Sequence, residues 1–150
     1  PYRMDKRIRE WCFGSFDGAY DGDLFMGLIP RIFNVDHVHQ LSYAELAEGL
    51  VEVDTAGWAE GWEKLSGRIK EGFEAIAKEM EEQGGGNALV VSHGMTIGTI
   101  VYLINGMHPH GLDNGSVTIL EYEDGQFSVE VVGDRSYREL GREKMEEIKN

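Results

Sequence analysis

A strand–turn–helix pattern over residues 88–104 constrains the fold of this chain most strongly. Residues 88–91 form an apolar run of the kind that fills a strand buried on both faces of a sheet. The run breaks at Ser92, His93 and Gly94, and residues 95–104 then resume an apolar pattern long enough for about three helical turns. The pattern predicts an α/β fold with a mainly parallel sheet flanked by helices.

His93 lies at the most informative point of this pattern, where the predicted strand ends and the helix begins. Ligands of open α/β sheets bind just outside the carboxyl ends of the strands, and a helix N-terminus offers N–H groups and a positive partial charge to an anion. Gly94 permits a sharp turn and a close approach of a ligand. These features favour an anion site, for phosphate, around His93. The alternative is a buried turn histidine that hydrogen-bonds to the backbone.

The composition limits the classes of partner. The chain has 27 acidic and 14 basic residues and a net charge of −13, which argues against nucleic acid or an anionic membrane as a partner, because both require a basic surface. A phosphorylated small molecule is compatible with this charge, since a few arginines can hold it. No apolar run is long enough to span a membrane. The single cysteine, Cys12, excludes an internal disulfide and predicts a reducing, cytoplasmic setting.

Local patterns predict the other elements. Ser42 and Glu45 have the spacing of a capping box at the start of a helix over residues 43–50. Apolar residues recur every three or four positions over residues 58–82 and predict a long helix with one buried face. Residues 117–122 and 127–132 predict an antiparallel hairpin, and residues 136–148 a charged terminal helix. No linker divides the chain, so we expect one domain over residues 1–150. One buried strand and a hairpin make a thin sheet, and a further segment should pair with residues 88–92.

Nucleophilic serine or cysteine chemistry is a competing hypothesis. Residues 90–94, Val-Val-Ser-His-Gly, are similar to a nucleophile elbow, but Val90 stands where that motif needs its first glycine. No phosphate-binding loop with an arginine follows Cys12, which we interpret as a small buried apolar group.

A metal site is another alternative. His37 and His39 form one His-x-His pair, and His108 and His110 form a second. On a strand this spacing would place both rings of a pair on one face. Both pairs fall in predicted loops, however, so the sequence favours a site without metal.

Two segments together resemble the histidine phosphatase superfamily, the phosphoglycerate mutase-like enzymes. Residues 9–18, Arg-Glu-Trp-Cys-Phe-Gly-Ser-Phe-Asp-Gly, are similar to the family's Glu-x-x-aromatic-Gly-x-aromatic-acidic-Gly segment. Residues 90–94 resemble the strand and turn that carry the family's second histidine, and residues 114–117 resemble the start of a late strand. The resemblance runs over residues 7–132. It implies an incomplete phosphoglycerate mutase-like fold, with three layers, a mainly parallel sheet flanked by helices and a C-terminal antiparallel hairpin.

The resemblance implies phosphoryl transfer through a phosphohistidine, without metal or cofactor. Glu10 would be the general acid that protonates the leaving oxygen and then the base that activates water. His93 would hydrogen-bond to the transferring phosphoryl group, and the backbone at Gly94 and Met95 would line the same pocket. An insert over residues 19–56 would cap the site and select the substrate, with Arg31 as a contact.

The sequence departs from the family pattern at the nucleophile. The family's nucleophilic histidine lies in an Arg-His-Gly motif near the N-terminus, and this sequence contains no Arg-His-Gly. A second phosphate-binding arginine of the following segment is also missing, and Gly98 stands where some members carry another arginine. We therefore interpret the chain as the C-terminal part of a histidine phosphatase domain. A degenerate member that binds phosphate without catalysis is the alternative.

These expectations define the function predicted from the sequence. The parent protein would hydrolyse a small phosphorylated metabolite, and phosphoglycerate mutase-type transfer is the alternative. The isolated chain would be inactive because it lacks the nucleophile. An N-terminal fragment or a second copy of the chain would cover the open edge of the central strand.

Overall fold

The computed structural model describes residues 2–20, 22–109 and 111–149. Helices dominate the first two thirds of the chain, and a hairpin and a last helix follow them. The elements are 3₁₀-helices Lys6–Ile8, Gly14–Phe16 and Val38–Gln40, a π-helix Gly22–Leu28, helices α1 Ile29–Phe33, α2 Tyr43–Val53, α3 Trp62–Glu82, α4 Gly94–Asn105 and α5 Ser136–Lys149, and strands β1 Val117–Glu123 and β2 Gln126–Asp134.

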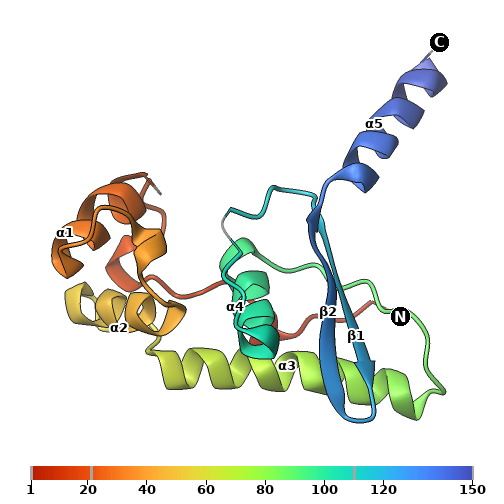
Figure 1. Cartoon of the computed structure of the whole chain (residues 1–150), viewed down its shortest axis with the longest axis horizontal. Coiled ribbons are helices and arrows are strands. Elements are labelled where there is room, and N and C mark those ends of the chain that lie inside the picture. Colours follow the sequence, from red (N-terminus) through yellow and green to blue (C-terminus); the bar gives the residue numbers. More distant parts are fainter. Residues whose placement is uncertain (1, 21, 110, 150) are drawn as a thin grey trace.

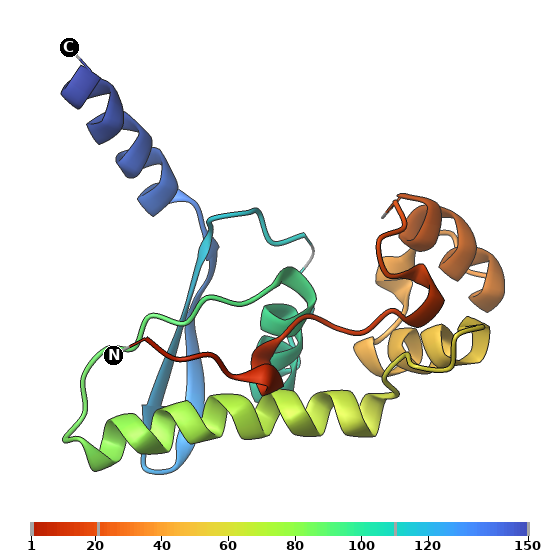
Figure 2. The same cartoon turned by 180° about the vertical axis from the view of Figure 1, so that it is seen from behind.

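The long helix α3 forms the base of the molecule (Figure 1). Helix α4 packs against its middle, the N-terminal segment crosses beside α4, and the hairpin stands on the other side of α4. The helices between residues 22 and 53 form a lobe at one end of α3 (Figure 1). Helix α5 projects away from the body, as both Figure 1 and the opposite view in Figure 2 show.

The described residues contain a single sheet, the antiparallel pair of β1 and β2. Its two-residue turn is Asp124-Gly125, and both residues have a positive φ, 51° and 79°. This conformation matches the twist of a tight hairpin and explains why Asp-Gly occurs there. The hairpin predicted from the sequence is confirmed, with slightly longer strands than expected.

The predicted central strand is the main difference between sequence and structure. Residues 87–93 carry no sheet hydrogen bonds, and the side chains of Leu89 and Val91 are 94% and 83% exposed. The three-layer parallel sheet is therefore not formed by the described residues. The physical reason is that a strand needs neighbours to satisfy its N–H and C=O groups, and among the described residues no segment pairs with it.

The helix signals in the sequence are largely confirmed. The Ser42–Glu45 capping box is present, and it starts α2 at Tyr43. Helix α3 begins at Trp62 instead of Trp58, because the preceding residues are held outside a helix. Asp54 Oδ2 accepts hydrogen bonds from the backbone N–H of Trp58 and Ala59, each at 2.7 Å.

The core lies between α2, α3, α4 and the N-terminal segment. The side chains of Leu65 and Ile69 on α3 and of Leu50 on α2 are at most 1% exposed, so the apolar stripe predicted for α3 does face the core. Trp11 is 4% exposed, and its indole N–H donates to Thr99 Oγ1 of α4 at 3.0 Å. Fully burying side chains of this kind contributes roughly 1.5–3 kcal/mol each.

A buried ion network fixes the N-terminal segment to α3. Glu60 has a side chain only 2% exposed, and its oxygens pair with Arg9 at 2.5 Å and with Arg68 at 2.6 Å. Burial would raise the pKa of Glu60, but the hydrogen bond and charge of Arg68, with the charge of Arg9, hold it below its usual value. Arg68 also donates to the carbonyls of Arg7, Arg9 and Glu10 at 2.8, 3.0 and 2.9 Å.

Replacing Arg68 by alanine should destabilise the protein strongly. The variant would leave Glu60 with one partner and would deprive three carbonyls of their donor, and breaking a buried pair in this way costs about 3–5 kcal/mol. Urea unfolding followed by circular dichroism measures the free energy of unfolding.

The matched control for Arg68→Ala is Lys70→Ala on the exposed face of α3. Lys70 pairs with Glu74 at 3.8 Å with a side chain 63% exposed, so its loss should change the free energy of unfolding by less than about 1 kcal/mol. Equal effects of the two substitutions would contradict the role assigned to Arg68.

Candidate active site

Hydrogen bonds from two sides fix the backbone of the segment that carries Glu10. Arg68 of α3 binds its carbonyl oxygens, as described above. From the α4 side, Ser92 Oγ donates to the carbonyl of Ile8 at 2.7 Å, and Thr96 Oγ1 donates to that of Arg9 at 2.7 Å. The backbone of Glu10 is therefore fixed relative to the start of α4.

The Glu10 carboxylate caps the N-terminus of α4. Its Oε1 accepts hydrogen bonds from the backbone N–H groups of Thr96 and Trp11, each at 3.0 Å, and lies 3.1 Å from Thr96 Oγ1, whose proton goes to the Arg9 carbonyl. Its Oε2 accepts from the backbone N–H of Met95 at 3.2 Å. A helix N-terminus has unsatisfied N–H groups and a positive partial charge, so it favours a carboxylate at this position.

Aromatic side chains pack beside the segment that carries Glu10. Trp11 contacts Tyr43 of α2 edge to face, with ring centroids 5.8 Å apart. Burial, with the negative charge of Glu10, raises the pKa of Tyr43 to about 12. Tyr43 therefore keeps its proton and donates to the carbonyl of Pro109 at 3.3 Å. A Cβ on Gly98 would lie 2.2 Å from the Tyr43 hydroxyl oxygen, so this contact requires glycine at position 98.

His93 is the N-cap residue of α4, with an extended backbone (φ −124°, ψ 162°). Its carbonyl accepts from the backbone N–H of Ile97 at 2.9 Å, the first bond of the helix. The residue is exposed, so the alternative of a buried turn histidine does not hold. The side chain is left accessible to a ligand at the point where the sequence placed it.

Glu10 and His93 line the same cavity, of about 260 Å³. Ser92 and Gly94 lie beside His93, and the opposite rim comes from the segment that precedes β1. The lining residues are Glu10, Ser92, His93, Gly94, Ile97, Leu112, Asp113, Asn114, Gly115 and Ser116.

Met95 takes a different place from the other expected site residues. Its backbone N–H is bonded to Glu10, and its side chain packs against the core. Gly94, in contrast, is part of the cavity lining.

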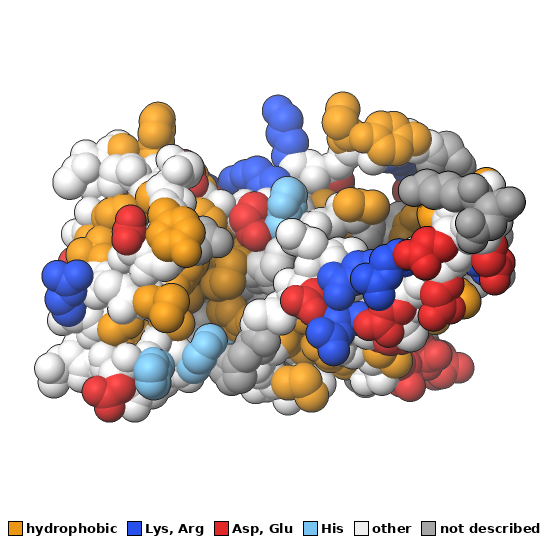
Figure 3. Space-filling model, turned by 90° about the horizontal axis from the view of Figure 1, so that it is seen from above, with side chains coloured by type: hydrophobic (Ala, Val, Ile, Leu, Met, Phe, Trp, Pro, Cys, Tyr) orange, Lys and Arg blue, Asp and Glu red, His pale blue; other side chains and the backbone are white. Residues whose placement is uncertain are grey.

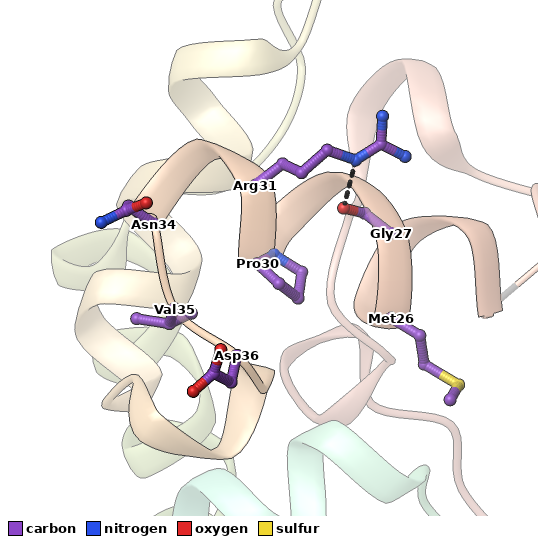
Figure 4. A pocket seen from close by; sticks show the side chains of 7 residues that line it. All are labelled: Met26, Gly27, Pro30, Arg31, Asn34, Val35 and Asp36. Atoms are coloured by element: carbon purple, nitrogen blue, oxygen red, sulfur yellow. Dashed lines mark hydrogen bonds between the residues drawn. The ribbon is translucent and has the colours of Figure 1, made fainter.

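Arg31 lies in a second hollow, within the lobe of residues 19–56 (Figure 4). This hollow has a volume of about 360 Å³ and is lined by Met26, Gly27, Pro30, Arg31, Asn34, Val35 and Asp36. Arg31 Nε donates to the carbonyl of Gly27 at 3.1 Å. The structure therefore does not bring Arg31 into the lining of the cavity of Glu10 and His93.

The residues of the competing hypotheses are engaged elsewhere. The Ser92 hydroxyl donates to a backbone carbonyl, and Cys12 Sγ lies 3.6 Å from Asp17 Oδ2. His108 stacks on Tyr43 with ring centroids 4.7 Å apart, and His110 lies outside the described residues. Across the described ranges, no cluster of three or more His, Cys, Asp and Glu side chains could hold a metal ion.

Two parts of the site were not predicted from the sequence. No role for Thr96 was predicted, yet its backbone N–H donates to Glu10 Oε1 and its hydroxyl donates to the carbonyl of Arg9. Residues 114–117 resemble the start of a late strand, but the structure has a turn at residues 114–115 and begins β1 at Val117, and residues 113–116 form the rim of the cavity. The backbone N–H of Ser116 donates to the carbonyl of Asp113 at 3.0 Å and closes that turn.

Comparisons with known proteins show the family to which the chain is related. Residues 1–135 match the family model of the histidine phosphatase superfamily, branch 1. A crystal structure of phosphoglycerate mutase from Bacillus anthracis str. Sterne is similar, with a TM-score of 0.83 and 35% sequence identity over 91% of this chain. The match covers 62% of the length of that mutase. A search of curated proteins gave no match.

None of the described helices is long and apolar enough to cross a membrane. The family match covers nine tenths of the chain and includes both Glu10 and His93. The chain belongs to the histidine phosphatase superfamily, branch 1.

Proposed function

We propose that this chain supplies the acid–base half of a phosphoryl-transfer site, and that the parent protein hydrolyses a phosphomonoester through a phosphohistidine. The observation that carries the proposal is that Glu10 and His93, 83 positions apart by their residue numbers, line one cavity at the N-terminus of α4. The family consists of enzymes of this general type, phosphatases and mutases.

The hydrogen bonds of Glu10 support a role in proton transfer. Oε1 accepts two backbone hydrogen bonds and lies beside the Thr96 hydroxyl, whereas Oε2 accepts one hydrogen bond, at 3.2 Å. Oε2 is therefore the oxygen with capacity left for a ligand. In the proposed reaction Glu10 gives a proton to the leaving oxygen and then takes one from the attacking water, and such positioned groups contribute about two to four orders of magnitude in rate.

The exposed position of His93 at the cavity supports a role in stabilising charge on the phosphoryl group. Its ring is exposed at the cavity and stands beside Gly94, whose lack of a side chain leaves room for a ligand. A donor aimed at the phosphoryl oxygens lowers the barrier because negative charge is spread over them in the transition state.

The nucleophile in this proposal comes from a segment that this sequence does not contain. The sequence has no Arg-His-Gly, and the chain spans 62% of the matched mutase. Residues 88–92 support the proposal, since this extended segment ends at His93 and exposes Leu89 and Val91. A strand that carries a nucleophilic histidine and pairs there would reach the same cavity.

The substrate is proposed to be a small phosphorylated metabolite, held without metal or cofactor. The helical lobe of residues 19–56 would close over it and select it, with Arg31 moving toward the cavity as a contact. The single cysteine fits a reducing cytoplasm as the site of action. Phosphoglycerate mutase-type transfer is the second candidate, and the similarity to a phosphoglycerate mutase favours it.

Residues 1–150 alone should not turn over p-nitrophenyl phosphate, because they lack the nucleophile. A continuous assay of p-nitrophenol release, with and without EDTA, measures this. Hydrolysis that survives EDTA would contradict the assignment of the nucleophile to another segment, and hydrolysis that EDTA abolishes would favour a metal site instead.

In a protein that joins this chain to a segment bearing the nucleophilic histidine, Glu10→Gln and His93→Ala should each lower kcat by about two to four orders of magnitude. The substitution Glu81→Gln, at an exposed position of α3, removes one carboxylate far from the cavity and should leave kcat unchanged. Thermal unfolding of each variant separates loss of chemistry from loss of fold. Wild-type kcat in both site variants would remove Glu10 and His93 from the mechanism.

A further inference from the structure

The cavity rim opposite His93 is pinned by residues at the junction of β2 and α5. Arg138 Nη1 donates to the carbonyl of Asn114 at 2.9 Å. Arg135 Nη1 donates to Asp113 Oδ2 at 3.2 Å, and Arg138 Nη2 lies 3.8 Å from the same oxygen. Two guanidinium groups that do not line the cavity therefore bind the turn of residues 113–116.

Glycines allow the close approach of these segments. Gly115 has φ +74°, which closes the turn, and a Cβ placed on it would lie 3.5 Å from Arg138 Cδ. Leu112, also in the lining, reaches to 3.1 Å from a Cβ position on Gly133 of β2. The rim thus packs directly on the end of the hairpin.

The charges at the rim matter for an anionic ligand. Asp113 is part of the cavity lining, and an unpaired carboxylate there would repel phosphate. Glu10, the other carboxylate of the lining, is compensated by the N–H groups of α4. Arg135 and Arg138 offset the negative charge of Asp113. Seen from the side to which α5 projects, acidic and basic side chains gather together over one half of the molecule (Figure 3).

The three side chains are 45–58% exposed, so the ion pairs themselves contribute little to the free energy of unfolding. Their effect falls instead on the geometry and the electric potential of the cavity. The family match ends at residue 135, which means that Arg138 reaches the rim from beyond the matched domain.

We infer that Arg135 and Arg138 are positioning residues of the anion cavity, which hold the rim of residues 113–116 in place and neutralise Asp113 beside a bound phosphate. The inference rests on the proposed function for its ligand, while the order of the rim can be tested without any ligand.

The experiment uses the full chain of 150 residues and compares Arg135→Ala/Arg138→Ala with Arg142→Ala. Arg142 is an exposed arginine on the same helix, one turn beyond Arg138, and does not line the cavity. Hydrogen exchange measured by NMR should be faster at the Ser116 amide in the double variant and unchanged in Arg142→Ala. Equal exchange in the double variant and wild type would overturn the positioning role.

The second arm measures the affinity for inorganic phosphate by NMR titration at low ionic strength. The double variant should bind phosphate about threefold to tenfold more weakly, because an exposed charge at this range contributes on the order of 1 kcal/mol. Adding Asp113→Asn to it should restore the affinity but not the slow exchange. Affinity that stays low in that triple variant would overturn the charge role of the arginines.

The two arms also separate this inference from the proposed function. If the wild-type chain bound no phosphate, the proposed anion cavity would be contradicted, and exchange at Ser116 would still decide the positioning role. Circular dichroism of all variants checks that α5 remains helical.

Discussion

The hydrogen bonds from the N-terminus of α4 to the Glu10 carboxylate are the interaction on which the site depends. They join a segment at the start of the chain to a helix more than 80 residues later, and they place His93, the N-cap of the same helix, beside Glu10 at one cavity. The sequence predicted that this helix N-terminus would receive an external anion. In the structure the side chain of Glu10 accepts hydrogen bonds from the Met95 and Thr96 N–H groups, so the proposed anionic ligand would bind next to the carboxylate, at His93 and Gly94.

A cavity for an anion in a chain of net charge −13 requires compensated carboxylates. Three acidic side chains near the site have neighbouring groups that offset their negative charge. Glu10 has the helix N-terminus, Glu60 has Arg68 and Arg9, and Asp113 has Arg135 and Arg138. Compensation by neighbours lets these side chains serve as structural or proton-transfer groups without filling the cavity with uncancelled negative charge.

Local signals in the sequence predicted the elements that local physics decides. The Ser42–Glu45 box, the apolar stripe of α3 and the Asp124-Gly125 turn each act within one or two turns of chain. Residues 88–92 behaved differently, because a strand depends on pairing partners and none of the described segments pairs with them. Single-sequence patterns carry no signal for contacts between positions far apart in the sequence. Such contacts include the hydrogen bonds of Arg68, those of Thr96, and the contacts of Arg138 with the rim of residues 113–116. The resemblance to a family supplied Glu10 and His93, and the structure supplied what holds them together.

The most direct test of the central claim is an NMR titration of the full chain with inorganic phosphate, mapped on assigned backbone amides and histidine side chains. The account predicts that the shifts concentrate at Glu10, His93 and Gly94 and extend to the rim at Asn114, and that His93→Ala weakens them. Shifts confined to the hollow around Arg31, or an unchanged response in His93→Ala, would contradict the assignment of the anion cavity to Glu10 and His93.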